Sequence, residues 1–127
     1  MIKKEGLGWR IIRDTSRDNF STLIGGEKWA IELNQVEWDN LVSSVNELSN
    51  QYNDIKSQLM GDEDITLELE RRPWLGILKG DKYGWDLTLI LNGSFSLNRG
   101  AEVYWPRNVT KQVAKAMRTM WDSDYYL

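Results

Sequence analysis

The 127-residue sequence contains no cysteine and no histidine. Without cysteine, the chain can form no disulfide, no thiolate nucleophile and no cysteine-ligated metal site. Without histidine, it lacks the side chain that most often serves as a general base near neutral pH and as a metal ligand. Only carboxylates, lysine, tyrosine and arginine remain for catalysis. We therefore expect a protein that is not an enzyme and has no catalytic residue, no metal site and no cofactor.

Proline and long apolar runs are also scarce. The chain has only two prolines and no low-complexity segment, so disorder is not expected away from its ends, and its length suits one domain over residues 1–127. No stretch approaches the ~20 apolar residues of a membrane span. The first nine residues, MIKKEGLGW, lack the apolar core of a signal peptide. We expect no membrane association and a cytoplasmic protein.

Tryptophan, by contrast, is abundant, with seven residues. Aromatic side chains dominate the energetics of protein cores, so we predict that most of the seven are buried. The stretch GWRIIRD at residues 8–14 shows the ambiguity that remains. In a strand, Trp9 and Ile11 would share one face while Arg10 and Ile12 share the other. Such a strand could pack a core or present aromatic and cationic groups to a ligand.

Two kinds of periodicity divide the chain. Alternating segments predict strands at residues 9–14, 20–24, 28–33, 65–71, 74–80, 85–91, 95–97 and 101–105. Between them, Asn34 and Glu37 have the spacing of a capping box. Apolar residues then recur in steps of three and four from Trp38 to Leu59, which predicts a helix over about 35–60 that ends at Gly61. We favour a helix lying on a sheet over a coiled coil, although its length would allow packing on a second subunit. A second helix is predicted over about 107–121.

The order of these segments suggests a repeat. Gly8-Trp9 and Gly84-Trp85 each open a predicted strand, and each half of the chain then runs into a helix. We predict an α+β fold with antiparallel sheets, built from two strand-strand-strand-helix halves whose helices lie to one side. On this interpretation Trp9 and Trp85 occupy equivalent core positions.

Basic and aromatic residues alternate in one region, which suggests a candidate contact surface. Cations that follow a phosphate backbone and rings that stack on bases are typical of single-stranded nucleic-acid grooves. The candidate residues for contact with nucleic acid or a protein partner are Arg71, Arg72, Trp74, Lys79, Lys82 and Tyr83. Glu68 and Glu70 lie nearby and the net charge is -3, and both facts disfavour a polyanionic ligand. Arg99 and Arg107 could instead form internal ion pairs with carboxylates such as Glu27 or Glu102.

The motifs EGLGWRIIRD, LIGGEKWAIELNQVEWDNL, ERRPW and GWDLTLIL…RGAEVYW together give the sequence a resemblance to a known family. Across nearly its whole length the chain resembles a small family of cyanobacterial proteins of unknown function. That resemblance implies the Whirly and transcriptional-coactivator fold of single-stranded-DNA-binding regulators, in which a strand-rich half followed by a helix occurs twice. A shared fold does not transfer an activity, and the resemblance implies no substrate or catalytic residue.

The function that we expect from the sequence is binding rather than catalysis. The long helix and the acidic charge balance favour a regulatory module that engages a protein partner or forms a homodimer. The alternative is a single-stranded DNA- or RNA-binding protein by analogy of fold, which the net charge disfavours.

Overall fold

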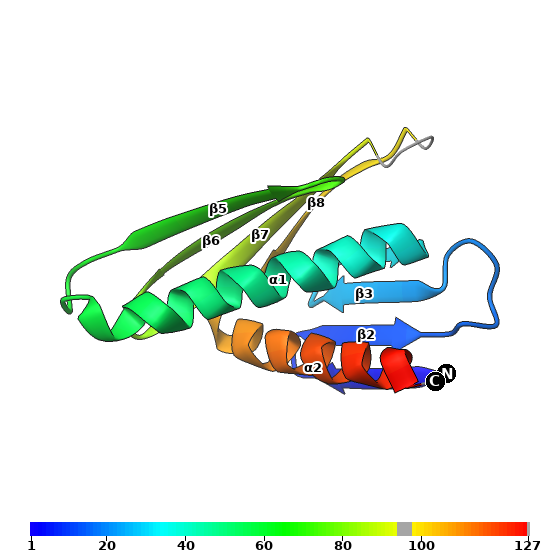
Figure 1. The fold of residues 1–127 in the computed structure, drawn as a ribbon, viewed down its shortest axis with the longest axis horizontal. Coiled ribbons are helices and arrows are strands. Elements are labelled where there is room, and N and C mark those ends of the chain that lie inside the picture. The colour runs from blue at the N-terminus through cyan, green and yellow to red at the C-terminus, as the bar shows by residue number, and fades with distance from the viewer. Residues whose placement is uncertain (94–97, 127) are drawn as a thin grey trace.

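The computed structural model describes residues 1–93 and 98–126, with side chains through Met120. Two antiparallel four-stranded sheets and two long helices make up this α+β fold (Figure 1). The first sheet contains β1 (Ile2–Gly6), β2 (Trp9–Arg13), β3 (Thr22–Gly26) and β4 (Ala30–Leu33) in sequence order. The second contains β5 (Ile65–Arg71), β6 (Trp74–Asp81), β7 (Gly84–Asn92) and β8 (Gly100–Trp105), also in sequence order. Helix α1 (Gln35–Ile55) follows the first sheet and α2 (Arg107–Tyr126) follows the second.

The predicted fold class is confirmed, but each half has four strands rather than three. The strand that the sequence did not reveal is β1, whose residues Lys3, Lys4 and Glu5 interrupt any apolar alternation. It pairs with β2 at the edge of the first sheet. Charged residues are common on edge strands because they discourage pairing with other chains, so the pattern is hard to distinguish from a polar terminus.

The long helix begins where the capping box predicts. The Asn34 side chain accepts from the Glu37 backbone N–H at 2.8 Å, and the Glu37 carboxylate accepts from the Asn34 N–H at 2.9 Å. The predicted extent of the helix is confirmed, because α1 ends at Ile55 and a 3-10 turn (Lys56–Gln58) continues it, but the C-cap of α1 is Lys56 rather than Gly61. The apolar residues spaced three and four apart, which form the seam of the helix, are buried from Trp38 to Tyr52. Ile55 and Leu59 are only half-buried, so a longer α-helix would bury little additional apolar surface.

The seam of α1 packs within its own chain. Trp38, Leu41, Val45 and Leu48 are all buried, and α1 lies against β5 and β6, which confirms the helix-on-sheet interpretation. Helix α2 covers β7 and also contacts β1 and β2. In Figure 1 both helices lie below the β5–β8 sheet, and the labelled strands β2 and β3 of the first sheet also lie below it.

The predicted equivalence of Trp9 and Trp85 is wrong. Trp9 is the first residue of β2, the second strand of its half. The corresponding residue of the other half is Trp74, which begins β6, whereas Trp85 lies in β7. Trp9 donates to Gln112 Oε1 on α2 at 2.8 Å, whereas the Trp85 ring packs on Tyr52 of α1 with centroids 6.0 Å apart. Because both tryptophans are buried and both follow glycine, sequence pattern alone could not separate them.

Two indoles join the sheets. Trp105 Nε1 at the end of β8 donates to the Gly25 carbonyl of β3 at 3.0 Å, and Trp29 Nε1 donates to the Tyr104 carbonyl at 3.1 Å. The two rings also contact each other, with centroids 5.2 Å apart. The sheets therefore meet at β3 and β8 and diverge from there (Figure 1).

Residues 93–99 connect β7 to β8, because Asn92 pairs with Gly100. The strand predicted at residues 95–97 lies entirely outside the described residues. Across residues 1–93 and 98–126, no helix is long and apolar enough to cross a membrane.

Candidate functional site

The structure distributes the six candidate contact residues over several environments. Trp74 belongs to the core: it is 1% exposed, and its indole N–H donates to the Glu37 carbonyl at 2.8 Å. Arg71 turns toward the helices and forms an ion pair with Glu47 of α1 at 2.5 Å. Arg72 is a strongly exposed turn residue, 3.5 Å from a Glu70 carboxylate oxygen. These three neighbours in sequence therefore do not share one surface.

The other three candidates lie farther along β6. Lys79 projects from the face of the sheet opposite the helices, beside Thr66 and Asp86 on the neighbouring strands. Lys82 and Tyr83 form the β6–β7 turn, where the Lys82 Nζ atom lies 5.8 Å from the centre of the Tyr83 ring. Arg72 and Lys82 thus stand at opposite ends of an eight-residue strand. The structure brings together Lys82 and Tyr83, but it does not gather all six residues around one groove.

The face of the β5–β8 sheet that points away from the helices forms the first candidate surface, which we call the outer sheet face. Strict alternation builds it, since every second residue of a strand points to the same side. Its apolar centre consists of Leu75 and Ile77 from β6, Ile90 from β7 and Tyr104 from β8. The first three are half-buried and Tyr104 is 47% exposed.

Carboxylates frame this apolar centre at both edges of the sheet. Glu68 and Glu70 on β5 pair in register with Ile77 and Leu75, and Glu102 on β8 pairs with Ile90. A fourth carboxylate, Asp86 on β7, accepts a hydrogen bond from the Tyr104 hydroxyl at 3.2 Å. Burial and the neighbouring Asp86 charge both raise the pKa of Tyr104, so its phenol stays protonated and remains a donor.

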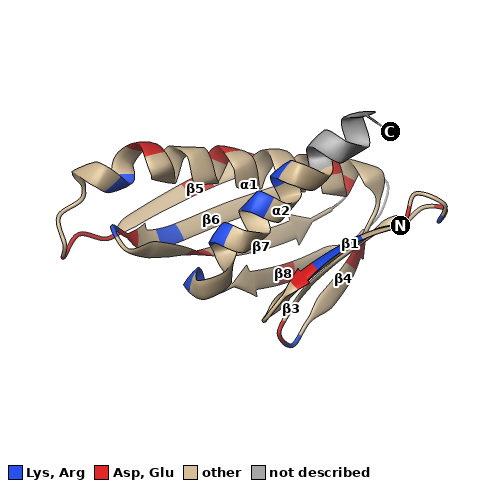
Figure 2. Cartoon of the chain, turned by 90° about the horizontal axis from the view of Figure 1, so that it is seen from below, with Lys and Arg blue, Asp and Glu red and all other residues tan. Residues whose placement is uncertain are grey.

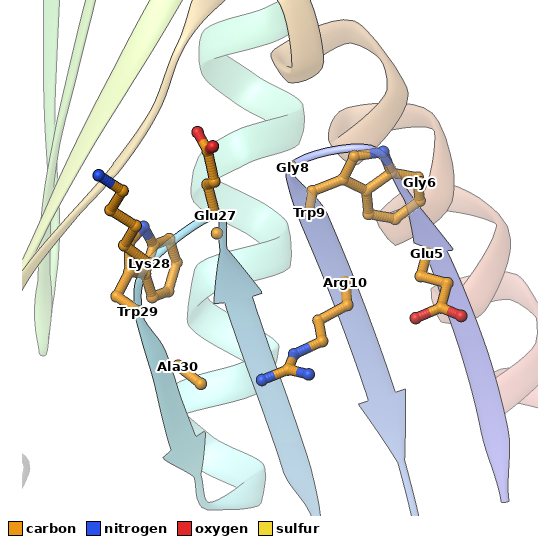
Figure 3. Close-up of a pocket in the computed structure, with 10 residues that line it drawn as sticks. Glu5, Gly6, Gly8, Trp9, Arg10, Glu27, Lys28, Trp29 and Ala30 are labelled. Carbon is orange, nitrogen blue, oxygen red and sulfur yellow. The ribbon is translucent and has the colours of Figure 1, made fainter.

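A second candidate surface lies on the first sheet, around the β1–β2 and β3–β4 turns (Figure 3). This open hollow has a volume of about 490 Å³ and is lined by Trp9, Trp29 and three glycines. Gly26 creates part of the space, because a Cβ atom there would lie 2.2 Å from Trp29 Nε1. Glu5, Arg10, Glu27 and Lys28 bring both signs of charge to its rim. With mixed charges and no convergent set of donors, the hollow indicates no particular ligand chemistry.

The GWRIIRD stretch packs the core with one face and exposes the other to solvent. Trp9, Ile11 and Arg13 are buried, whereas Arg10 is exposed at the hollow. The Arg13 guanidinium donates to Thr22 Oγ1 at 2.7 Å and lies 5.2 Å from the Trp38 ring centre. Packing thus explains most of this strand.

Arg99 and Arg107 both form internal ion pairs, as predicted, but their partners are not the carboxylates that the sequence suggested. Arg99 pairs with Glu37 at 2.6 Å, and Arg107 pairs with Asp81 at 3.1 Å, in place of the suggested Glu27 or Glu102. The Glu37 side chain is fully buried, while Asp81 is partly exposed in the β6–β7 hairpin. The capping-box spacing marked Glu37 as a helix-start residue, but no local signal indicated that Arg99, 62 positions later, would neutralise it.

A solved structure of another protein closely resembles this chain. A comparison with curated proteins found no match. Among solved structures, a protein of unknown function from Prochlorococcus sp. NATL2A, which its description assigns to the DUF155 family, is 72% identical in sequence. The two superpose with a TM-score of 0.90 over 95% of this chain and 99% of that one.

The family assignment of this chain itself comes from its sequence. The family model described as "Domain of unknown function (DUF1818)" matches residues 4–120. This family differs from the one named for the solved relative. The resemblance to the Whirly fold stays a prediction, since neither comparison names that fold. The match spans both sheets and most of α2, and the chain belongs to the DUF1818 family.

Proposed function

We propose that this protein is a non-catalytic binding module whose outer sheet face docks a protein partner. The observation that carries the proposal is the arrangement of that face: an apolar centre between carboxylates at both edges of one sheet. Protein interfaces commonly combine an apolar core with a polar rim, and Tyr104 is of a residue type that is enriched in them. The absence of cysteine and histidine from the sequence supports binding rather than catalysis.

The charge of the frame indicates the chemistry of the partner. Among the described residues of this face, four carboxylates, Glu68, Glu70, Asp86 and Glu102, accompany one lysine, Lys79. Arg72 in the β5–β6 turn lies 3.5 Å from the Glu70 carboxylate, so the carboxylates still outnumber the cations. Complementary charges guide association and exclude wrong partners. The partner should therefore present an apolar contact surrounded by lysine or arginine side chains.

The same charge argument disfavours two other occupants. In a two-fold symmetric dimer, each patch meets its own copy, so the carboxylates of both subunits would lie within one interface. A nucleic acid would place its phosphates against the same carboxylates, and the six candidate residues are not gathered around one groove. We therefore do not propose homodimer formation or binding of single-stranded DNA or RNA as the function of this face. The experiments below measure both.

The proposal can be tested by affinity capture from native lysate, followed by binding measurements with the purified captured protein. We expect Glu68→Lys/Glu102→Lys to weaken binding about tenfold, equivalent to about 1.4 kcal/mol, mainly through slower association. Ile77→Ser should also weaken binding, because it removes apolar contact from the centre. The matched controls are Asp62→Lys in the α1–β5 loop and Val36→Ser on α1, both exposed and off the sheet.

Three results would contradict the proposal. One is capture that nuclease treatment abolishes, together with direct binding of a dT oligonucleotide. Another is a dimer in light scattering that Ile77→Ser converts to a monomer, which would identify a second copy as the occupant. The third is a captured protein whose affinity is equally affected by the sheet variants and by their matched controls.

A further inference from the structure

A cleft on the opposite side of the molecule has a different character from the outer sheet face. It lies between α1 and α2 and is closed at one end by the β6–β7 turn, with a volume of about 200 Å³. Tyr52 of α1 and Trp85 of β7 form its aromatic part, with ring centroids 6.0 Å apart. Tyr83, which is 75% exposed, stands beside it.

Among the residues whose side chains the structure describes, every charged residue that lines this cleft is positive. They are Lys56 after α1, Lys82 in the β6–β7 turn, and Lys111 and Arg118 on α2. Figure 2 shows that Lys and Arg recur along α2. None of the four forms an ion pair with a carboxylate in the described part of the chain, whereas the cations of Arg71, Arg99 and Arg107 do. Four cations from three separate elements thus converge in a protein whose net charge is negative.

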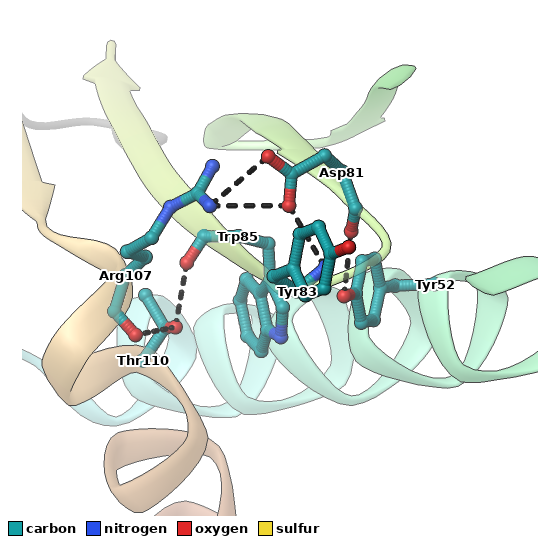
Figure 4. Close-up of polar contacts among 6 residues, drawn as sticks. All are labelled: Tyr52, Asp81, Tyr83, Trp85, Arg107 and Thr110. Carbon is teal, nitrogen blue, oxygen red and sulfur yellow. Dashed lines mark hydrogen bonds and ion pairs between the residues drawn. The ribbon is translucent and has the colours of Figure 1, made fainter. Parts of the chain in front are cut away.

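A network of hydrogen bonds holds these three elements together (Figure 4). The Tyr52 hydroxyl donates to the Asp81 carbonyl at 2.8 Å, which joins α1 to the hairpin. The Asp81 carboxylate accepts from Arg107 at 3.1 Å and from the Tyr83 backbone N–H at 2.8 Å, which joins α2 to the same hairpin. Thr110 Oγ1 donates to the Trp85 carbonyl at 2.8 Å. The cleft is therefore built before any ligand binds, and the Asp81 carboxylate of the adjoining hairpin is already engaged.

We propose that this cleft binds a small polyanion that carries phosphate groups. Lysine and arginine are the side chains that bind phosphate oxygens through charge-assisted hydrogen bonds. The volume lies below the ~300–1,000 Å³ of pockets for drug-sized ligands, so the bound group is about the size of pyrophosphate, free or as the phosphate end of a nucleotide. This site is separate from the proposed protein-docking face, which lies on the other side of the β5–β8 sheet.

The test is calorimetric titration of the full chain with pyrophosphate, ATP and inorganic phosphate at low ionic strength. We expect pyrophosphate or ATP to bind with a Kd of about 1 mM or below, and inorganic phosphate to bind about tenfold more weakly because it reaches fewer of the four cations. Lys111→Gln/Arg118→Gln should raise the Kd about tenfold or more. Lys115→Gln is the matched control, since Lys115 is exposed on α2 but does not line the cleft.

A second readout locates the ligand without relying on affinity. On addition of pyrophosphate, the backbone amide resonances of Tyr52, Tyr83 and Lys111 should shift, whereas those of β1 and β4 should not. Circular dichroism of each variant establishes that it is folded. The docking variant Glu68→Lys/Glu102→Lys should bind pyrophosphate like the wild type, so failure of either proposal can be told from failure of the other.

Four outcomes would overturn the proposal. They are the absence of pyrophosphate and ATP binding at low ionic strength, equal affinities for phosphate and pyrophosphate, and an equal effect of Lys115→Gln and the cleft variant. The fourth is a single-stranded oligonucleotide that binds where pyrophosphate does not, which would assign the cations to a nucleic acid.

Discussion

At the scale of single residues, Glu37 contacts one partner that is near in the sequence and one that is far away. Its carboxylate caps the Asn34 N–H, three positions away, and forms an ion pair with Arg99, 62 positions away. Arg99 also donates to the Glu32 carbonyl at 2.6 Å, and its guanidinium lies 4.7 Å from the centre of the Phe20 ring. One arginine therefore joins the segment before β8 to β4, to the β2–β3 loop and to the start of α1.

Removing Arg99 should destabilise the protein strongly. Arg99→Ala leaves the fully buried Glu37 carboxylate without its cation, and breaking a buried pair in this way costs about 3 kcal/mol of unfolding free energy. Glu37→Gln in the Arg99→Ala background should recover part of that loss, because a neutral amide needs no counter-charge. Urea denaturation measures both effects. Arg72→Ala, at a strongly exposed pair, should change stability by less than about 1 kcal/mol, and a loss equal to that of Arg99→Ala would refute the argument.

At the scale of elements, the β6–β7 hairpin depends on the small size of Gly80. A Cβ atom there would lie 2.4 Å from the Gly84 carbonyl oxygen and 2.8 Å from the Cβ atom of Trp85. Both neighbours belong to the paired strand, so they cannot move without distorting the register between Gly80 and Trp85. The hairpin also carries Asp81 and Tyr83, so its geometry positions one end of the basic cleft.

We expect Gly80→Ala to lower the unfolding free energy by about 1–3 kcal/mol, as overpacking does in well-packed regions. Gly61→Ala is the matched control, since a Cβ atom there would lie 3.7 Å from its nearest neighbour, the Tyr83 hydroxyl. That variant should be neutral or slightly stabilising, because alanine restricts the unfolded chain. Thermal unfolding of the two variants tests the difference, and equal midpoints would show that the close contact at Gly80 carries no cost.

At the scale of the whole molecule, Asp81 holds the two helices to the second sheet. Backbone hydrogen bonding from Tyr83 and the Arg107 pair lower the pKa of its carboxyl from the ordinary value of 3.8. A carboxyl whose pKa is lower in the folded state stabilises the fold above its unfolded pKa, and that contribution is lost as the pH falls through the folded pKa. Asp14 shifts in the same direction, through hydrogen bonds from Ser16.

The protein should therefore lose stability as the pH falls below about 4, and Asp81→Asn should make this acid loss shallower. At neutral pH the same variant should be less stable than the wild type, since it lacks the charge that pairs with Arg107. Urea midpoints measured between pH 2 and pH 7 test both statements. An acid limb of the same steepness in Asp81→Asn and the wild type would show that Asp81 does not contribute to it.

Short-range patterns in the sequence were enough to predict the local structure. Alternation identified most strands, the spacing of Asn34 and Glu37 located the start of α1, and the seam from Trp38 showed which side of the helix is buried, because these features depend on residues only a few positions apart. Other features become visible only in the folded chain: the pairing of Arg99 with Glu37, the matching strand positions of Trp9 and Trp74, and the shared cleft of Lys56, Lys82, Lys111 and Arg118. These contacts join positions far apart in the chain, and no short-range pattern records which distant partners folding brings together.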